Sequence, residues 1–265
     1  IVEIQAQGEE THARGAMNDA VDELGRIDST FGYHDSLIQE LNAKNIIRNH
    51  ELHDLVRLSL QVHQDSAGAF SLTLRPILDA WGFTDTQEFR IPSPDEFDAW
   101  RSLPGDSGIV PGKDGETIQT QAGTRIDLGA ITKGYAADRA ARIMQKKGIQ
   151  SGLINAGGDI SAFGGRTWRI GIKHPRRPGI FATIPIKNRA IATSGDYERF
   201  FVKDGRRYCH ILDPATGRPP DKYISTTIVA ENCIDADAWA TALFVKGLDS
   251  LENVLIQKGM DWIVI

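Results

Sequence analysis

The chain has 265 residues, of which 41% are hydrophobic and 25% are charged, a composition typical of globular proteins that bury a sizeable core. A net charge of −5 gives no basic footprint, which argues against nucleic acid as the main partner. No run of about 18 apolar residues occurs, so the sequence offers no candidate for a membrane-spanning helix.

The first 114 residues alternate predicted helices with loops. Apolar periodicity and capping residues predict, in order, a strand at Ile1–Gln7 and helices at Thr11–Leu24, Ser36–Asn42, His50–Asp65 and Pro94–Leu103. A loop is expected at Phe31-Gly32-Tyr33 and Asp35-Ser36, where the apolar pattern is interrupted. Phe70 and Trp81 are expected to be core aromatics. Thr84–Asp114 is rich in Pro, Gly and Asp, which indicates an excursion from the core rather than a domain boundary.

The middle of the chain predicts a strand–helix–strand unit. Ile126–Leu128 is expected to end a buried strand, and Gly129 lets the backbone turn tightly before a helix over Lys133–Lys147. Ser151–Asn155 is apolar enough to form the second buried strand.

Both strand ends of this unit carry glycine beside one acid. Asp127 precedes Gly129, and Asp159 follows Gly157 and Gly158. Backbone without side chains next to carboxylates suits a phosphate-bearing ligand with a divalent ion. Either glycine cluster alone is more often an ordinary turn, but two in one unit favour a ligand site.

The last hundred residues predict mostly strands. Hairpins are expected at Ile160–Ile172, around Gly164-Gly165, and at Phe200–Leu212, around Asp204-Gly205. Further predicted elements are strands at Ala182–Ile186, Ala190–Thr193, Ile224–Ala230 and Trp262–Ile265, and helices at Ile234–Val245 and Leu251–Lys258. So many hairpins exclude a doubly wound parallel sheet and predict an α+β fold of mixed, largely antiparallel sheets with packed helices. Two cysteines, Cys209 and Cys233, are expected to be buried spectators.

Two places in this half carry side chains suited to chemistry. Asp237 and Thr241 lie four residues apart on a helix, so one face presents a carboxylate and a hydroxyl, which are ligands that suit Mg²⁺. The alternative is an exposed acid, but the surrounding Ala and Trp make this face too apolar for that. His210 lies at a predicted strand end before a turn. Its position fits a general base and a purely structural residue equally well, so both roles remain open.

These segments occur in the same order as the motifs of the ApbE-type FAD:protein FMN transferases, a flavin transferase family that the chain resembles over nearly its whole length. The matching segments are Asp127–Asp138, Asn155–Asp159, Thr193–Tyr197, His210–Gly217 and Ala236–Ala242. The resemblance implies a single domain over residues 1–265 with a two-lobed architecture related to the T-fold, and with FAD bound between the lobes.

The resemblance also implies the residues of the site. Magnesium beside the FAD pyrophosphate would be held by Ala130, Asp237, Ala240 and Thr241. FAD contacts would come from Phe31, Gly68, Ala69, Phe70, Asp127, Lys133, Asn155, Gly157, Gly158, Asp159 and Ile211. His210 would take the proton from the incoming hydroxyl. Family members often carry Asp where this chain has Ser71, so one polar contact of the family is not expected here.

The implied reaction transfers FMN from FAD to a Thr or Ser hydroxyl of an acceptor protein and releases AMP. Two alternatives remain: an FAD pyrophosphatase that uses water as acceptor, and a flavin-binding protein without chemistry. The acceptor implied by the resemblance is a subunit of a membrane respiratory or ion-pumping complex. The chain begins with Ile rather than Met, so a mature or trimmed product is expected, exported or membrane-associated on the extracytoplasmic side, with the cytoplasm as the alternative.

Overall fold

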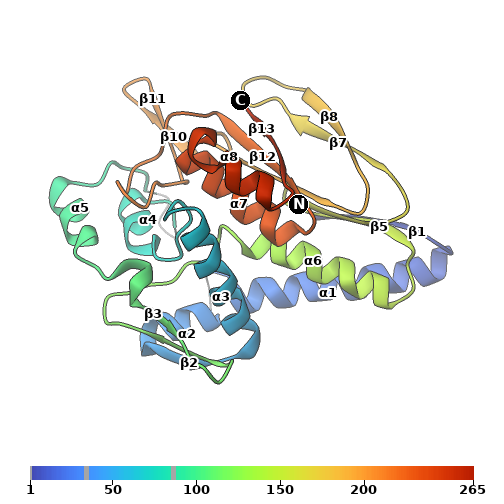
Figure 1. The fold of residues 1–265 in the computed structure, drawn as a ribbon, viewed down its shortest axis with the longest axis horizontal. Coiled ribbons are helices and arrows are strands. Elements are labelled where there is room, and N and C mark those ends of the chain that lie inside the picture. The colour runs from blue at the N-terminus through green and yellow to red at the C-terminus, as the bar shows by residue number, and fades with distance from the viewer. Residues whose placement is uncertain (1, 33–35, 85–87) are drawn as a thin grey trace.

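The computed structural model describes residues 2–32, 36–84 and 88–265. Its main element is a six-stranded antiparallel sheet, which helices cover on one face (Figure 1). The strands of this sheet, in spatial order, are β1 (Val2–Gln7), β5 (Ser151–Ala156), β6 (Asp159–Gly164), β9 (Ala190–Gly195), β12 (Ser225–Ala230) and β13 (Asp261–Val264). The antiparallel order confirms the predicted α+β class.

Three smaller sheets surround this one. Their strands are β2 (Ile46–Arg48), β4 (Thr117–Thr120) and β3 (Ile109–Pro111); β7 (Trp168–Lys173) and β8 (Ile180–Ile186); and β10 (Phe200–Lys203) and β11 (Arg206–Cys209). The helices are α1 (Glu10–Phe31), α2 (Leu37–Lys44), α3 (His50–Asp65), α4 (Arg75–Trp81), α5 (Pro94–Arg101), α6 (Thr132–Lys146), α7 (Cys233–Lys246) and α8 (Leu248–Gln257). None of the helices described is long and apolar enough to cross a bilayer.

Helices α6 and α7 lie side by side on the sheet, and α1 packs along the outer side of α6 (Figure 1). The α6 stripe predicted from Ala136, Ala137 and Ala140 is buried, and these small side chains allow a close approach. At Gly134 a Cβ would lie 2.3 Å from the Cys233 carbonyl oxygen, so only glycine fits where the two helices meet. This contact fixes the start of α6 against the first turns of α7.

The opposite face of the sheet is covered by the β7–β8 hairpin. Its inward side chains, among them Trp168, Ile172 and Ile186, form a separate apolar cluster with Leu153 and Ile191 of the sheet. The sheet is therefore covered on both faces, which explains why the residues of β5 and β6 are buried almost without a break rather than at alternate positions.

A second apolar cluster lies under α4 and α5. It contains Trp81, whereas Phe70 lies in the main core; both predicted core aromatics are buried, at 0% and 1% exposure. The Trp81 indole Nε1 donates to the Gly217 carbonyl oxygen at 2.8 Å. This bond joins α4 to the turn that follows His210, so two segments 136 residues apart in the sequence meet beside a predicted site residue.

Three connected predictions are wrong: the loop at Phe31, the strand at Ile126–Leu128 and the strand–helix–strand unit that includes it. The first helix runs through Phe31, so that residue ends α1 instead of lying in a loop, while Tyr33 and Asp35 lie outside the described residues. Ile126–Leu128 is not a strand, because its backbone hydrogen bonds go to the Asn42 side chain and to the Leu72 carbonyl. Thus α6 follows a loop, and the strand–helix–strand unit does not form.

The hairpin predicted at Ile160–Ile172 is also wrong. β6 pairs with β5 and β9, and β7 pairs with β8. The tight turn instead lies at Gly157 and Gly158, whose φ angles of 69° and 105° place both in the positive region. The other predicted elements occur in the predicted order, including the hairpin that turns at Asp204-Gly205, and Cys209 and Cys233 are buried. No sequence pattern predicts β2, β3, β4 or α4.

The β5–β6 turn makes a stability prediction. Gly158→Val should lower the free energy of unfolding by about 1–3 kcal/mol, because a β-branched residue is strained at a φ of 105°. Urea unfolding measures this. The matched control is Gly165→Val, since a Cβ at Gly165 meets nothing within 4 Å and its φ is not in the positive region. Equal losses in the two variants would contradict the turn assignment.

Candidate active site

A cluster of one lysine and two carboxylates lies where α6, β6 and α7 meet. Lys133, at the start of α6, forms ion pairs with Asp159 of β6 and, at 3.4 Å, with Asp237 of α7. The Gly134 backbone N–H donates to the other Asp237 oxygen at 3.0 Å. Asp159 and Asp237 are 2% and 4% exposed, whereas half of the Lys133 side chain is accessible. The two carboxylates of the cluster are thus buried, and the Lys133 ammonium lies on its solvent-accessible side.

The electrostatics of this cluster favour a further positive charge. Burial raises the pKa of Asp159 above its ordinary value, and the neighbouring Asp237 raises it further, against the opposing effect of Lys133. Burial acts to lower the pKa of Lys133, but the charges of Asp237 and Asp159 outweigh it, and the net shift is upward. Two buried carboxylates therefore share one ammonium, an arrangement that a proton or a metal cation stabilises.

The remaining predicted metal ligands surround Asp237. Thr241 lies one turn further along α7, with its hydroxyl 3.1 Å from that of Ser194 on β9. Ala130, in the turn just before α6, is half-buried. The Ala240 carbonyl oxygen accepts a hydrogen bond of 2.8 Å from the Thr226 hydroxyl. Because a helical carbonyl also accepts from the residue four positions on, Ala240 is the least available of the four.

Among residues 2–32, 36–84 and 88–265, no group of three or more His, Cys, Asp or Glu side chains is arranged to hold a metal. A Mg²⁺ ion needs fewer, because it usually binds one or two carboxylates and completes its octahedron with water or phosphate. The excess of buried carboxylate over ammonium fits such an ion, and the Thr241 hydroxyl is a hard oxygen donor of the kind it prefers.

The predicted glycine and asparagine contacts border this cluster. A Cβ on Gly157 would lie 3.9 Å from the Lys133 side chain, so the β5–β6 turn passes directly beside it. The Asn155 side chain accepts from the Gly158 N–H at 2.8 Å and thereby holds the turn. Gly157-Gly158 is thus an ordinary hairpin turn, and this turn also lies against the Lys133 side chain.

Asp127 connects the cluster to the segment between α3 and α4. Its side chain accepts from the Gly129 N–H at 2.7 Å, which forms an Asx turn before α6. Its own N–H donates to the Leu72 carbonyl at 2.7 Å. Asp127 is therefore placed between the acidic cluster and the segment that follows Gly68, Ala69 and Phe70.

Three predicted FAD contacts have side chains in the core. Phe31 packs against Tyr135 with ring centroids 6.3 Å apart, Phe70 is 1% exposed, and Ile211 lies in an apolar cluster with Cys209 and Phe244. Any contact of these residues with a ligand would have to use the backbone or an edge of the side chain.

His210 lies just after β11 and within the electrostatic reach of Lys133. Burial lowers the pKa of its imidazole to about 4, and the charges of Arg199 and Lys133 act in the same direction. Its Nδ1 lies 3.3 Å from the Arg199 carbonyl oxygen, and an N–H at this position donates to it. The ring is therefore neutral at pH 7, with Nε2 as its proton acceptor.

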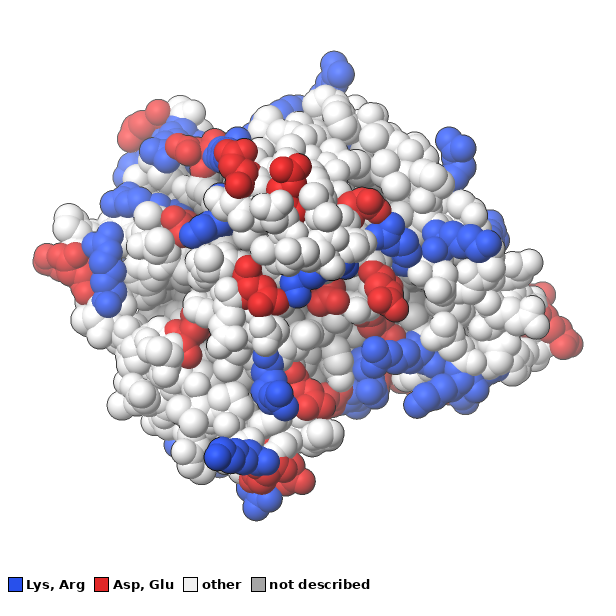
Figure 2. Space-filling model, in the orientation of Figure 1, with Lys and Arg blue, Asp and Glu red and all other residues white. Residues whose placement is uncertain are grey.

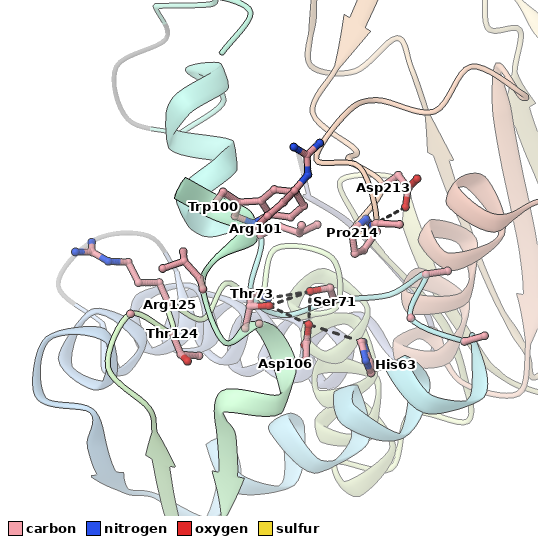
Figure 3. A pocket seen from close by; sticks show the side chains of 18 of the residues that line it. His63, Ser71, Thr73, Trp100, Arg101, Asp106, Thr124, Arg125, Asp213 and Pro214 are labelled. Atoms are coloured by element: carbon pink, nitrogen blue, oxygen red, sulfur yellow. Dashed lines mark hydrogen bonds and ion pairs between the residues drawn. The ribbon is translucent and has the colours of Figure 1, made fainter. Parts of the chain in front are cut away.

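A pocket of about 440 Å³ lies beside the Gly68-Ala69 turn (Figure 3). Its floor is the carboxylate of Asp106, which accepts from the hydroxyls of Ser71 and Thr73 and from the Leu72 N–H at 2.8 Å. Figure 3 shows these side chains converging from separate segments, with His63 next to them, while Trp100 and Arg101 of α5 lie across the opening from Asp213 and Pro214.

Sequence reasoning missed Asp106. It lies in the Pro- and Gly-rich excursion, where no local pattern marks it, and it reaches back 35 residues to Ser71. Ser71 donates to the Asp106 carboxylate, so a buried acid lies beside the Gly68-Ala69 turn although position 71 itself is a serine.

The geometry can be compared with known proteins. A sequence model of the ApbE family matches residues 1–264. The chain belongs to the ApbE family. The protein of Salmonella typhimurium named FAD:protein FMN transferase is 33% identical over 218 residues, which are 78% of this chain and 62% of that protein. One from Treponema pallidum with the same name is 32% identical over 244 residues, 81% of this chain and 66% of that protein. This chain therefore spans less than two thirds of the length of the Salmonella relative.

Solved ApbE structures have the same fold. The crystal structure of the ApbE protein from Thermotoga maritima superposes with a TM-score of 0.90 at 32% identity, over 99% of this chain and 89% of that one. The flavin transferase ApbE from Vibrio cholerae superposes with a TM-score of 0.83 at 26% identity, over 100% of this chain and 89% of that one.

In this ApbE-family chain, Asp138 of α6 links the elements that carry the two carboxylates of the cluster. Its carboxylate, 7% exposed, accepts from the N–H groups of Cys233 and Ile234, at 2.8 and 3.0 Å, and from the Ser161 hydroxyl at 2.9 Å. A carboxylate at a helix N-terminus is favoured by the helix dipole. Asp138 of α6 thus fixes β6 and α7, which carry Asp159 and Asp237.

Asp138→Ala should be strongly destabilising. It leaves the buried N–H of Cys233 and the half-buried N–H of Ile234 without their partner, at a cost of about 1–3 kcal/mol for a buried group. Denaturant unfolding gives the loss. Ser161→Ala, which removes only one hydroxyl partner of the same carboxylate, is the control and should cost about 1 kcal/mol. A loss no larger than that of the control would show that Asp138 does not hold the helix.

Proposed function

We propose that the protein transfers FMN from FAD to a Thr or Ser hydroxyl of an acceptor protein and releases AMP. The observation that carries this proposal is the pair of buried carboxylates, Asp159 and Asp237, that faces the single ammonium of Lys133. A binding module for flavin has no need of such a cluster, whereas a site for a pyrophosphate with a divalent cation does. Family membership and the names of the relatives support the same reaction.

In the proposed complex, FAD extends between the pocket above Asp106 and the Lys133 cluster, with Asp127 between them. Asp237 and Thr241, with the backbone oxygen of Ala130 and less readily that of Ala240, would hold Mg²⁺. When bound, Mg²⁺ supplies positive charge to the oxygens of the phosphoryl group that is transferred. Lys133 adds a second positive charge at the opening of the same cluster.

The chain's own residues then handle the proton. The acceptor hydroxyl oxygen forms a bond to the flavin-side phosphorus, and the bond from that phosphorus to the bridging pyrophosphate oxygen breaks, so that AMP leaves. The hydroxyl proton goes to the neutral imidazole of His210, whose Nε2 is the free acceptor. We propose the two-lobed single domain over residues 1–265 as the unit that performs this step.

The test is incubation of the protein with FAD and Mg²⁺, with and without an acceptor, followed by mass spectrometry of all products. An acceptor that gains one FMN, together with free AMP, is the expected result. FMN and AMP in equal amounts, with no labelled acceptor under any condition, would make the protein an FAD pyrophosphatase. FAD that is bound and recovered intact would make it a flavin carrier.

The acceptor class and the location are also proposals, and both rest on the resemblance. We propose a subunit of a membrane respiratory or ion-pumping complex as acceptor, reached from the extracytoplasmic side, and do not expect nucleic acid as a partner. Fractionation of cells followed by in-gel flavin fluorescence tests both points. Labelled proteins found only in the soluble cytoplasmic fraction would reverse this location.

A further inference from the structure

The net charge of −5 conceals a strongly basic segment. Residues 160–195 contain seven Lys and Arg and no Asp or Glu. This segment includes the β7–β8 hairpin, whose inner face is apolar and packs on the sheet. The upper right of Figure 2, where Figure 1 places β7 and β8, shows blue and white atoms at its edge. The basic side chains are thus left for the outer face of the hairpin.

The tip of this hairpin, residues 173–181, combines these cations with exposed apolar side chains. Ile180 is 67% exposed and Phe181 is 49% exposed, although neither is needed to complete the inner apolar cluster. Arg177 is exposed and forms no ion pair with any residue that the structure describes. The other two cations of the tip are paired, Lys173 with Glu198 at 3.6 Å and Arg176 with Asp196, so Arg177 supplies the uncompensated charge. Exposed apolar groups next to such a cation are typical of a surface that binds a partner.

The tip lies against the segment that leads from one predicted site residue to another. Arg176 binds Asp196 with both guanidinium nitrogens, at 2.7 and 2.5 Å, directly after β9. Two residues earlier, Ser194 contacts Thr241, and three residues later the Arg199 carbonyl accepts from the His210 N–H at 3.0 Å. A macromolecule bound at the tip would therefore lie next to the proposed reaction site.

We propose that the hairpin tip, residues 173–181, is the docking surface for the acceptor protein, and that it binds a patch of carboxylates that surrounds an apolar side chain. This inference rests on the proposed transferase function, because it assigns the partner of that reaction. The uncompensated charge of Arg177 favours an acidic partner, and the Arg176–Asp196 ion pair holds the tip beside the segment that leads to Thr241 and His210. An anionic bilayer would match the charge but would have no reason to lie next to these residues.

The experiment uses a library of Thr-centred peptides with random flanking residues, incubated with FAD and Mg²⁺. Flavin-labelled peptides are isolated by fluorescence and sequenced. The wild-type protein should enrich Asp and Glu near the labelled Thr. Arg177→Glu should lower labelling of the acidic peptides roughly tenfold, since an added like charge costs about 1.4 kcal/mol or more. Phe181→Ser should lower it in the same direction.

The matched control is Lys187→Glu, the same charge reversal at the other end of β8, where the side chain is also exposed. It should label the library as the wild type does. FAD affinity and FAD hydrolysis in water should be unchanged in Arg177→Glu, which also shows that this variant is folded. Labelling that is equally weakened in both charge variants would overturn the assignment of the tip.

Further outcomes separate this proposal from the one on which it rests. Peptides labelled without acidic enrichment would overturn the docking surface but leave the transfer reaction intact. Labelling of no peptide and no protein would reject the transfer itself. Binding of the wild type, but not Arg177→Glu, to phosphatidylglycerol vesicles, with equal peptide labelling by both, would assign the tip to a membrane surface instead.

Discussion

Replacing Asp237 with Asn is expected to lower FMN transfer by at least about 10²–10³-fold, the usual effect of removing one preorganised charge from the transition state of such a site. Asp237 is the only carboxylate among the four proposed metal ligands, and the others are neutral oxygens. Asn can still accept the 3.0 Å hydrogen bond from Gly134, so the α6–α7 contact and the fold should persist. Initial rates at several Mg²⁺ concentrations measure the effect.

Asp235→Asn is the control for this prediction. It makes the same chemical change two residues earlier on α7, where Asp235 is near the Asn232 cap and away from Lys133. Transfer by this variant should stay close to that of the wild type. If Asp237→Asn turns over within about tenfold of the wild-type rate at modest Mg²⁺, Asp237 is not a ligand of the metal.

The parts of the fold that the sequence predicts correctly are those with local signals. His50–Asp65 has the predicted bounds of α3, because Asn49 caps its start and its apolar residues recur at helical spacing. The pairing of β6 had no such signal. All but one of its residues are buried, so the alternation that identifies a partner face is absent, and a Gly pair occurs at each of its ends.

The candidate site divides in the same way. Asp127, Lys133, Asp159 and Asp237 belong to motifs that the family resemblance singles out, and the last three do meet in space. Asp106 could not be found, because its partners Ser71 and Thr73 are more than thirty residues away and the segment between them has no regular pattern. Its role depends on tertiary structure alone.

Phe31 shows how a turn signal and a helix signal can conflict. A loop was expected there because glycine and polar residues follow, yet the helical spacing of Leu24, Ile27 and Phe31 continues the buried face of α1. The buried ring then packs on Tyr135 of α6. The apolar spacing outweighed the turn residues that follow it.

His210→Ala is expected to lower transfer to an acceptor protein by roughly 10²–10⁴-fold, the usual contribution of a general base. FAD affinity should barely change, because Asp127, Lys133 and the β5–β6 turn remain. Residual FAD hydrolysis should survive, since a water molecule is small enough to be activated without the imidazole. Loss of transfer with retained binding therefore distinguishes a base from a residue that only supports the strand end.

The pH dependence gives an independent test of the same residue. Because burial lowers the pKa of His210 to about 4, the imidazole is neutral at every pH well above 4 and loses its acceptor only as the pH falls through that value. Transfer should thus show no titration near pH 6.5, where an exposed histidine titrates. His50→Ala, which removes an exposed histidine of α3, should leave both the rate and the pH profile unchanged.

A wild-type rate in His210→Ala would show that His210 is a structural residue. Asp196 would then be a poor alternative base, because it is held by Arg176. Asp159 would be the base to test next.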